Sequence, residues 1–519
     1  MMSEQRYKLH WITAVIETLK AVKEAIFPLI VLIFANGWRK GGTGLWYVDY
    51  LSYIIFGVLI IFLLVSGIIK WIRFEYWFED DELRIESGLF VKKKRYIPFD
   101  RIQSLDYTEG IFHRPFQLVK VKVETAGSSS LKKAEGELTA ITKEAANRIE
   151  YEMQAAKKRK KEAVNGVNEL ETKEIMDAMP VEEVIDEVIP SKKIFSMTNK
   201  DLLLLATTSG GIGVILSGVA IFLSQFGDIL PYEWMFEEIS AFIKFGILIV
   251  GIVVFLALLF VWLLSVGMTY LSHYGFTVSL EKEDIVITRG LLEKKRVTVP
   301  LKRVQSVSVN ENPLRQLFGY ANVVLHSAGG GVGDSSKINL FPLVKKNRLK
   351  EPLQEIFPEL NLEEPNYKLT SRGRHFYYRI DFVWMLPVIG ALSYFFFPYG
   401  LFSLAIIPII IGMGLWQHRS AAIGLDGQQL TMRYRGIGLH TAYMMKKRIQ
   451  SMEMRQSYFH KRKGVATIVT NVKSGIGVHH ATVQHMEVEE AERLYDWYGG
   501  NKKAVDRQAD KNVGERLED

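Results

Sequence analysis

Residues 299–306 read VPLKRVQS, and they are the middle copy of a motif that recurs along this chain of 519 residues. The first copy is IPFDRIQS at 97–104, and the third is MKKRIQS at 445–451. An Arg-Ile/Val-Gln-Ser tetrapeptide that appears three times indicates a repeated structural unit, because self-similarity at long spacing is typical of repeat architectures.

A glycine precedes each motif arginine at a nearly constant distance. The distance is 13 residues in the first two copies and 12 in the third, which therefore has a one-residue deletion: Gly88 and Arg101, Gly290 and Arg303, Gly436 and Arg448. Alternating apolar and polar residues beside each glycine predict half-buried antiparallel strands that turn at the glycine. One amphipathic helix is expected to close each unit, over 138–153, 340–356 and 487–498.

Long uncharged segments precede each copy, and a membrane span needs about 20 apolar residues. We predict six transmembrane helices in three hairpins: 22–40 with 49–70, 202–224 with 245–271, and 380–396 with 401–417. The last pair is a single uncharged run in which Pro398 and Gly400 predict a tight reversal.

Charge predicts the orientation of these hairpins. The middle hairpin tip is acidic, with Asp228, Glu233 and Glu237, whereas basic residues gather at the opposite ends. Only Arg39 and Lys40, in the first tip, argue the other way. Because positive residues favour the cytoplasmic side, we expect a multi-pass protein of the cell membrane whose termini and soluble segments are all cytoplasmic.

Several function classes lack their usual residues. The chain has no cysteine, and a net charge of +8 is too modest at this length to imply nucleic acid. No predicted span holds an ionisable residue near its centre, which disfavours a transporter. His479, His480 and His485 cluster without a pattern that completes a metal site. We expect no catalytic residues, no cofactor and no metal.

The strand order, the glycine turn, the Arg-Ile-Gln-Ser motif, the closing helix and the preceding hairpin resemble the bacterial pleckstrin-homology-like (PH-like) membrane proteins of the YdbS/YdbT group. The resemblance covers nearly the whole chain and is greatest to the three-repeat members. It implies an α+β membrane protein in which each hairpin is followed by a seven-stranded PH-like barrel or sandwich with a C-terminal helix. It also implies no enzymatic activity. The third copy departs from the pattern at His440 to Tyr443, where the others have basic residues.

The resulting domain plan is the following: 1–21 cytoplasmic segment, 22–72 hairpin 1, 73–156 PH-like domain 1, 157–198 charged linker, 199–271 hairpin 2, 272–362 PH-like domain 2, 376–417 hairpin 3, 418–498 PH-like domain 3, and 499–519 disordered tail. The resemblance suggests a scaffold for a protein partner, such as a smaller single-repeat relative, in envelope protection or stress response. A lipid-handling protein that binds anionic head groups is the alternative, and a transporter is the third.

Two sets of residues are candidates for binding. The motif residues either stabilise strand ends or line a ligand-facing edge: Arg101, Gln103, Ser104, Arg303, Gln305, Ser306, Arg448, Gln450 and Ser451. The basic runs either are solvated strand ends or contact an anionic leaflet, where each charge contributes about 1 kcal/mol: Lys92, Lys93, Lys94, Arg95, Lys294, Lys295 and Arg296.

Overall fold

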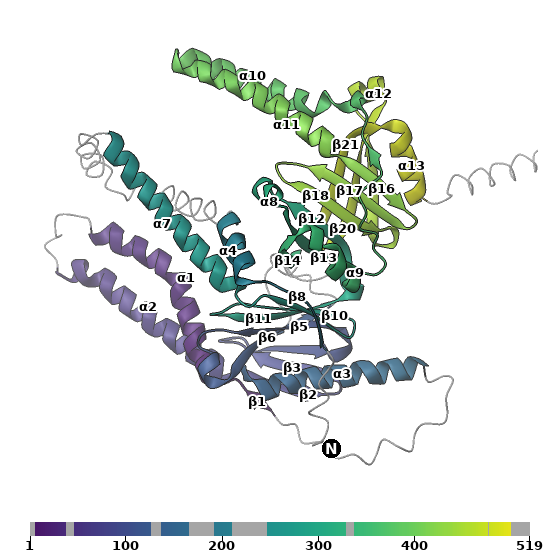
Figure 1. Cartoon of the computed structure of the whole chain (residues 1–519). Coiled ribbons are helices and arrows are strands. Elements are labelled where there is room, and N and C mark those ends of the chain that lie inside the picture. The colour runs from purple at the N-terminus through teal and green to yellow at the C-terminus, as the bar shows by residue number, and fades with distance from the viewer. Residues whose placement is uncertain are drawn as a thin grey trace, which may run out of the picture. The chain divides into compact units, whose positions relative to one another are not determined.

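The computed structural model describes residues 6–37, 46–125, 136–165, 191–209, 247–328, 337–475 and 477–499, and Figure 1 shows its helices and strands. The chain forms two compact units that meet at Pro300 and Leu301 in the sequence. We call them the N-terminal unit and the C-terminal unit. Each is a mixed α+β structure built from antiparallel sheets and helices.

Each repeat contributes seven described strands and a closing helix. Repeat 1 has β1 (Tyr7–Lys8), β2 (Glu75–Glu79), β3 (Glu82–Ser87), β4 (Lys93–Pro98), β5 (Ile102–Glu109), β6 (Leu118–Thr125), β7 (Gly136–Thr142) and α3 (Lys143–Asn165). Repeat 2 has β8 (Ser191–Ser196), β9 (Thr277–Glu281), β10 (Asp284–Arg289), β11 (Lys294–Pro300), β12 (Val304–Glu311), β13 (Tyr320–Ser327), β14 (Lys337–Lys345) and α9 (Lys350–Ile356). Repeat 3 has β15 (Tyr367–Lys368), β16 (Ala422–Asp426), β17 (Gln429–Arg435), β18 (Leu439–Met445), β19 (Ile449–Arg455), β20 (Val465–Ser474), β21 (Gly477–Glu487) and α13 (Val488–Gly499).

The hairpin helices lie between the first and second strands of each repeat, a placement that the predicted domain boundaries do not include. They are α1 (Ile12–Gly37) and α2 (Trp46–Ile72), α4 (Asn199–Thr208) and α7 (Ile247–His273), and α10 (Phe376–Phe395) and α11 (Ile406–Ser420). The strand before the hairpin then pairs with the strand after it, as Tyr7 does with Tyr76 and Tyr367 with Ile423. Each hairpin is therefore inserted into its soluble domain.

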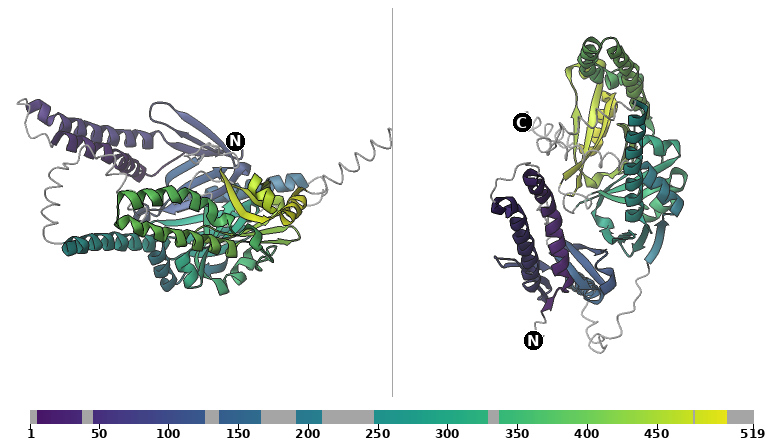
Figure 2. Two further views of the ribbon diagram at one scale, coloured as in Figure 1. Left: turned by 90° about the horizontal axis from the view of Figure 1, so that it is seen from above. Right: turned by 90° about the vertical axis from the view of Figure 1, so that its left-hand side faces the viewer.

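Two described helices are long and apolar enough to cross a membrane, over Phe255–His273 and Tyr399–Ser420, and Gly57–Ile72 is a shorter one. Their apolar side chains are largely exposed, as with Phe255 at 63% and Phe260 at 68%. In both views of Figure 2, α10 and α11 lie side by side, joined by the predicted reversal at Pro398 and Gly400. The predicted spans 202–224 and 245–271 fall partly outside the described residues, so the count of six remains a prediction.

Buried aliphatic residues from two sheets form the cores of repeats 1 and 3. In repeat 1, Leu83 and Ile85 of β3 share one cluster with Val121 of β6 and Ile149 of α3. In repeat 3, Leu430 of β17, Ile468 of β20 and Leu494 of α13 do the same. This arrangement is a β-sandwich closed by a helix.

The predicted start of the closing helix is wrong in two repeats. Residues 138–142 belong to β7 and residues 340–345 to β14, and the helices begin only at Lys143 and Lys350. Short apolar runs do not distinguish a buried strand from a helix by periodicity. In repeat 3 the closing helix begins at Val488, one residue after the predicted start.

The sheets cross the boundaries between repeats. Their strand orders are β1-β2-β3-β4, β7-β6-β5-β11-β10-β9-β8, β14-β13-β12-β18-β17-β16-β15 and β19-β20-β21. The second sheet thus joins repeat 1 to repeat 2 within the N-terminal unit, where β5 and β11 lie side by side (Figure 1). The third joins repeat 2 to repeat 3 within the C-terminal unit.

Candidate functional site

The repeated motif forms one turn of 3-10 helix followed by a β-bulge. The turns are η1 (Phe99–Arg101), η4 (Leu301–Arg303) and η8 (Lys446–Arg448), so the motif arginine ends each turn. Directly afterwards the register shifts between the apolar and serine positions of the motif in all three repeats. The motif glutamine is the extra residue of the bulge. A bulge bends a strand and increases its twist, so the motif marks the same bend in each repeat.

The motif side chains differ in exposure from repeat to repeat. Ser104 is buried and its Oγ donates to Glu124 Oε2 at 3.1 Å, whereas Arg101 is exposed. The Gln103 side chain is not among the side chains that the structure describes. In repeat 2, Gln305 Nε2 donates to the Arg303 carbonyl at 3.1 Å.

Two further differences concern the motif serines and the third repeat. Ser306 is buried like Ser104, whereas Ser451 is exposed and accepts a hydrogen bond from Asn471 Nδ2 at 2.8 Å. Arg448 is half-buried and Gln450 is exposed. The motif serine is therefore exposed in the third repeat and buried in the first two.

Two strand pairs connect neighbouring repeats: β5 with β11, which we call the first join, and β12 with β18, which we call the second join. Both joins have the same register when residues are counted from the motif arginine. In the first join Glu109, eight residues after Arg101, lies opposite Lys294, nine before Arg303. In the second join Glu311, eight residues after Arg303, lies opposite Leu439, nine before Arg448. Position +8 of one repeat thus faces position −9 of the next in each case.

A polar cleft of about 270 Å³ lies at the first join, in the N-terminal unit. Tyr107 of β5 donates its hydroxyl to Glu150 of α3 at 2.9 Å, and the Arg296 guanidinium lies 5.9 Å from the Tyr107 ring centre. Burial and the neighbouring Glu150 carboxylate raise the pKa of Tyr107. Arg296 also forms an ion pair with Glu281 at 2.8 Å. Within the lining of this cleft, Lys143 forms an ion pair with Glu109 at 2.9 Å.

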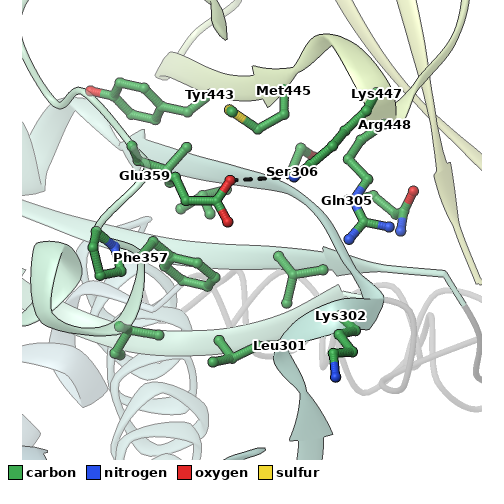
Figure 3. Close-up of a pocket in the computed structure, with 15 residues that line it drawn as sticks. Leu301, Lys302, Gln305, Ser306, Phe357, Glu359, Tyr443, Met445, Lys447 and Arg448 are labelled. Carbon is green, nitrogen blue, oxygen red and sulfur yellow. Dashed lines mark hydrogen bonds and ion pairs between the residues drawn. The ribbon is translucent and has the colours of Figure 1, made fainter. Parts of the chain in front are cut away.

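A second cleft, of about 340 Å³, lies at the second join in the C-terminal unit (Figure 3). Three candidate motif residues line it together, Gln305 and Ser306 from β12 and Arg448 from η8. An ion pair of 3.4 Å links Lys447 to Glu359 and is the dashed line in Figure 3. Of the motif side chains that the structure describes, these three line one cleft together, and those of repeat 1 belong to the other unit.

The glycine turn of each repeat is the turn at Gly88, Gly290 or Gly436. Each of these turns is hydrogen-bonded to the end of the second helix of its hairpin. In repeat 1, Arg73, directly after α2, donates to the Leu89 carbonyl. In repeat 2, the Leu291 amide donates to the Leu271 carbonyl of α7 at 2.9 Å. In repeat 3, Gln417 of α11 donates to the Gly436 carbonyl at 3.4 Å. The three turns therefore lie where the hairpin enters its soluble domain.

These turns expose apolar side chains. Phe90 and Val91 are 81% and 70% exposed, and Leu292 and Ile437 are also exposed. The turn is tight in the first two repeats. At Gly290 φ is +106°, and an added Cβ would lie 2.0 Å from the Glu293 carbonyl oxygen. An apolar tip at the end of an apolar helix is suited to contact with a bilayer surface.

The basic runs beside these turns are partly neutralised. Lys92 and Lys94 both form ion pairs with the buried Glu86 carboxylate, 2.9 Å away in the case of Lys94, and these contacts lower the Glu86 pKa. Lys93 is exposed. In repeat 2, Lys295 pairs with Glu293 at 3.6 Å.

The histidines form pairs that the sequence did not indicate. The His326 and His479 rings stack with centres 3.7 Å apart, and His485 Nδ1 lies 3.1 Å from His460 Nε2. Burial, helped by the His479 ring, lowers the pKa of His326 to about 3. Burial, helped by Lys337, lowers the pKa of His479 to about 4. Among the described residues no group of three or more His, Asp or Glu side chains could hold a metal ion.

Comparisons with known proteins place these repeats in a family. The chain matches the Bacterial PH domain family over residues 25–157, 228–356 and 384–502. It is 35% identical over 509 residues to the UPF0699 transmembrane protein YdbT of Bacillus subtilis (strain 168), covering 97% of this chain and 99% of that protein. No solved structure matches. The chain therefore belongs to the family of bacterial transmembrane proteins with repeated PH domains.

Proposed function

We propose that this protein is a non-enzymatic membrane scaffold that presents three PH-like modules at the cytoplasmic face of the cell membrane. Six transmembrane helices in three hairpins hold the modules, and both termini are cytoplasmic. A protein partner, such as a smaller single-repeat relative, binds the modules in envelope protection or stress response.

The attachment of each glycine turn to the end of its hairpin supports this proposal most directly. Each repeat has one such contact: Arg73 to Leu89, Leu291 to Leu271, and Gln417 to Gly436. A module that is bonded to its hairpin on this side, and that begins with a strand before the hairpin, has little freedom to turn. Modules fixed in this way under one membrane have a high effective concentration, so weak contacts combine into avidity.

The exposed tip of the first repeat favours a second function, the binding of anionic lipid head groups. Phe90 and Val91 project beside Lys93, and an apolar tip next to a cationic side chain is what a charged leaflet attracts. This candidate and the scaffold differ in what the modules recognise.

Crosslinking in native membranes, followed by purification and identification of bound molecules, tests the scaffold. The variant carries Arg101→Ala, Arg303→Ala and Arg448→Ala. The matched control carries Arg348→Ala, Arg372→Ala and Arg493→Ala, three exposed arginines outside the motif. We expect a stoichiometric protein partner with the wild type and the control, and its loss with the motif variant at equal membrane abundance. Recovery of lipid alone would overturn the scaffold.

A polarity-sensitive fluorophore tests the lipid candidate, because the chain has no native cysteine. It is attached at Phe90→Cys in the full chain, in nanodiscs of phosphatidylglycerol or phosphatidylcholine. Tyr151→Cys on α3, which is also exposed, serves as the control. Contact with anionic lipid predicts a blue shift at position 90 that appears only with phosphatidylglycerol and weakens with salt. Equal spectra in the two lipids would remove this candidate.

A further inference from the structure

Two edge strands, the fourth strand of repeat 1 (β4) and the fifth strand of repeat 3 (β19), hold different positions in their repeats. β4 is the last strand of the order β1-β2-β3-β4, and β19 is the first of β19-β20-β21. Within the described part of the chain, each of them has a strand partner on one side only. Such an edge presents a row of backbone donors and acceptors that can pair with another strand.

The counterparts of these two edges are paired in the interior of the protein. β11 and β18 hold the position of β4 in their repeats, and they pair with β5 and β12 of the preceding repeat. β5 and β12 in turn hold the position of β19. Each join thus uses a fifth strand of one repeat and a fourth strand of the next, and among the described strands one of each type remains unjoined.

We propose that β19 of one copy pairs antiparallel with β4 of a second copy, so that copies join head to tail in the membrane. A second copy carries the complementary strand in the geometry that the two internal joins already use. The contact is heterologous, because two different surfaces meet, and a contact of this kind generates rows or rings rather than closed two-fold dimers. It does not depend on the scaffold's protein partner.

The register follows from the internal joins. If position +8 faces position −9, then Gln456 lies opposite Lys92 and Arg455 lies opposite Lys93. The same register places Glu453 opposite Arg95, a pair of opposite sign.

Electrostatics set the strength of this contact. Arg455 and Lys93 have the same charge, but Arg455 is already paired with Glu453 at 2.6 Å. In the first join the corresponding residue is Thr108, opposite Lys295, and Glu109 lies opposite Lys294. Since β19 lacks that acidic residue, the contact between copies is weaker than the internal join and can be reversed.

The basic side chains of β4 do not argue against pairing. Lysines on an edge strand often prevent association. However, β11 carries Lys294, Lys295 and Arg296 at the matching positions and is paired throughout that run. Basic side chains at these positions are therefore compatible with a strand in the interior of a sheet in this fold.

Disulfide crosslinking between two differently tagged full chains tests the proposal without background, because no cysteine is native. One chain carries Lys93→Cys and the other carries Arg455→Cys, and both are oxidised in their membrane. We expect a disulfide-linked dimer with both tags. A chain with both substitutions should give a ladder of higher species. Thr108→Cys with Lys295→Cys, which face each other in the first join, is the positive control and closes within one chain.

Gln456→Cys replaces Arg455→Cys as the register control, because neighbouring strand residues point to opposite faces. Its yield with Lys93→Cys should be much lower. Arg455→Glu should raise recovery of the uncrosslinked, differently tagged copy about two- to fivefold, since an opposite-charge pair replaces a like-charge pair. The proposal is overturned if the mixed dimer is absent while the positive control closes, if Gln456→Cys crosslinks equally well, or if the doubly substituted chain closes only on itself.

Discussion

The two joins between repeats have the same register but different chemistry. The first, β5 with β11, has three described residue pairs and is charged, with Glu109 opposite Lys294 and Tyr107 opposite Arg296. The second, β12 with β18, has six pairs, and its strands carry mainly apolar and small polar side chains such as Val309 and Ala442.

The common register therefore does not come from particular side-chain contacts. What the joins share is the turn of 3-10 helix and the bulge that place each fifth strand at a fixed offset from its motif arginine. The backbone sets the alignment, and the side chains decide how strongly each join holds and under which conditions.

Removal of the bulge should have the largest effect. Deletion of Gln305 takes out the extra residue, so Val304 and Ser306 become neighbours in a regular ladder and β12 loses the bend that joins it to η4. We expect a loss of about 3–5 kcal/mol, enough to unfold the C-terminal unit. The measurement is thermal unfolding in detergent by tryptophan fluorescence. Gln305→Ala keeps the bulge and should cost under about 1 kcal/mol. An unchanged melting temperature for the deletion would show that the fold does not need the bend of the bulge.

The glycine turn before each fourth strand should be the next most sensitive. Gly290→Ala requires a side chain at positive φ with its Cβ against a carbonyl oxygen, which costs about 1–3 kcal/mol. At Gly436 an added Cβ meets nothing within 4 Å, so Gly436→Ala should change stability by less than about 0.5 kcal/mol. Thermal melts of the two variants measure the difference. Equal costs would mean that the one-residue deletion in repeat 3 leaves its turn as strained as the others.

Acid should weaken the C-terminal unit before the N-terminal unit. His326 and His479 have pKa values of about 3 and about 4 when folded, below the ordinary value of about 6.5. As the pH falls, the unfolded chain therefore binds protons at these histidines at a higher pH than the folded chain does. The stability that these groups contribute is present above about pH 6.5 and is lost as the pH falls toward 4. The pKa of Glu86 in the N-terminal unit is lowered from 4.5, so its contribution is lost only below that pH.

Hydrogen exchange of each unit between pH 7 and pH 4 measures this difference. His326→Phe should flatten the pH dependence of the C-terminal unit, because the stacked pair then has one titrating ring fewer. Loss of protection in both units at the same pH would contradict the expectation.

A small effect is expected from the hydroxyl in the first join. Tyr107→Phe removes the hydrogen bond to Glu150 and should cost about 1 kcal/mol. Tyr151→Phe, on the exposed surface of α3, is the matched control and should be neutral. A thermal melt of both variants suffices, and equal melting temperatures would mean that water replaces the lost partner.

Much of the fold could be predicted because it depends on sequence patterns within single segments of the chain. Apolar runs long enough to cross a membrane predicted helices, and α2 and α7 extend over the expected segments. The glycine and the motif arginine located the turns around the fourth strand in every repeat. The predicted helix over 340–356 was wrong in its first half, because the buried β14 has apolar residues on both faces.

The candidate site was only partly predictable. The motif residues were identified as a set, but their assembly at Gln305, Ser306 and Arg448 depends on how two repeats meet. The partner of His479 was missed because His326 lies in another repeat and has no signal of its own. The first strands Tyr7–Lys8 and Tyr367–Lys368 are too short to show an alternating pattern.

By itself the sequence determined that this protein has three repeats, a hairpin in each, and a β-rich domain closed by a helix. These features depend on side-chain periodicity along one segment. Only the tertiary structure decided that the hairpin is inserted after the first strand and that the fifth strand of one repeat pairs with the fourth strand of the next. Those pairings are made by backbone N–H and C=O groups, which are the same in almost every residue. The identity of the side chains therefore does not specify which strand edges pair.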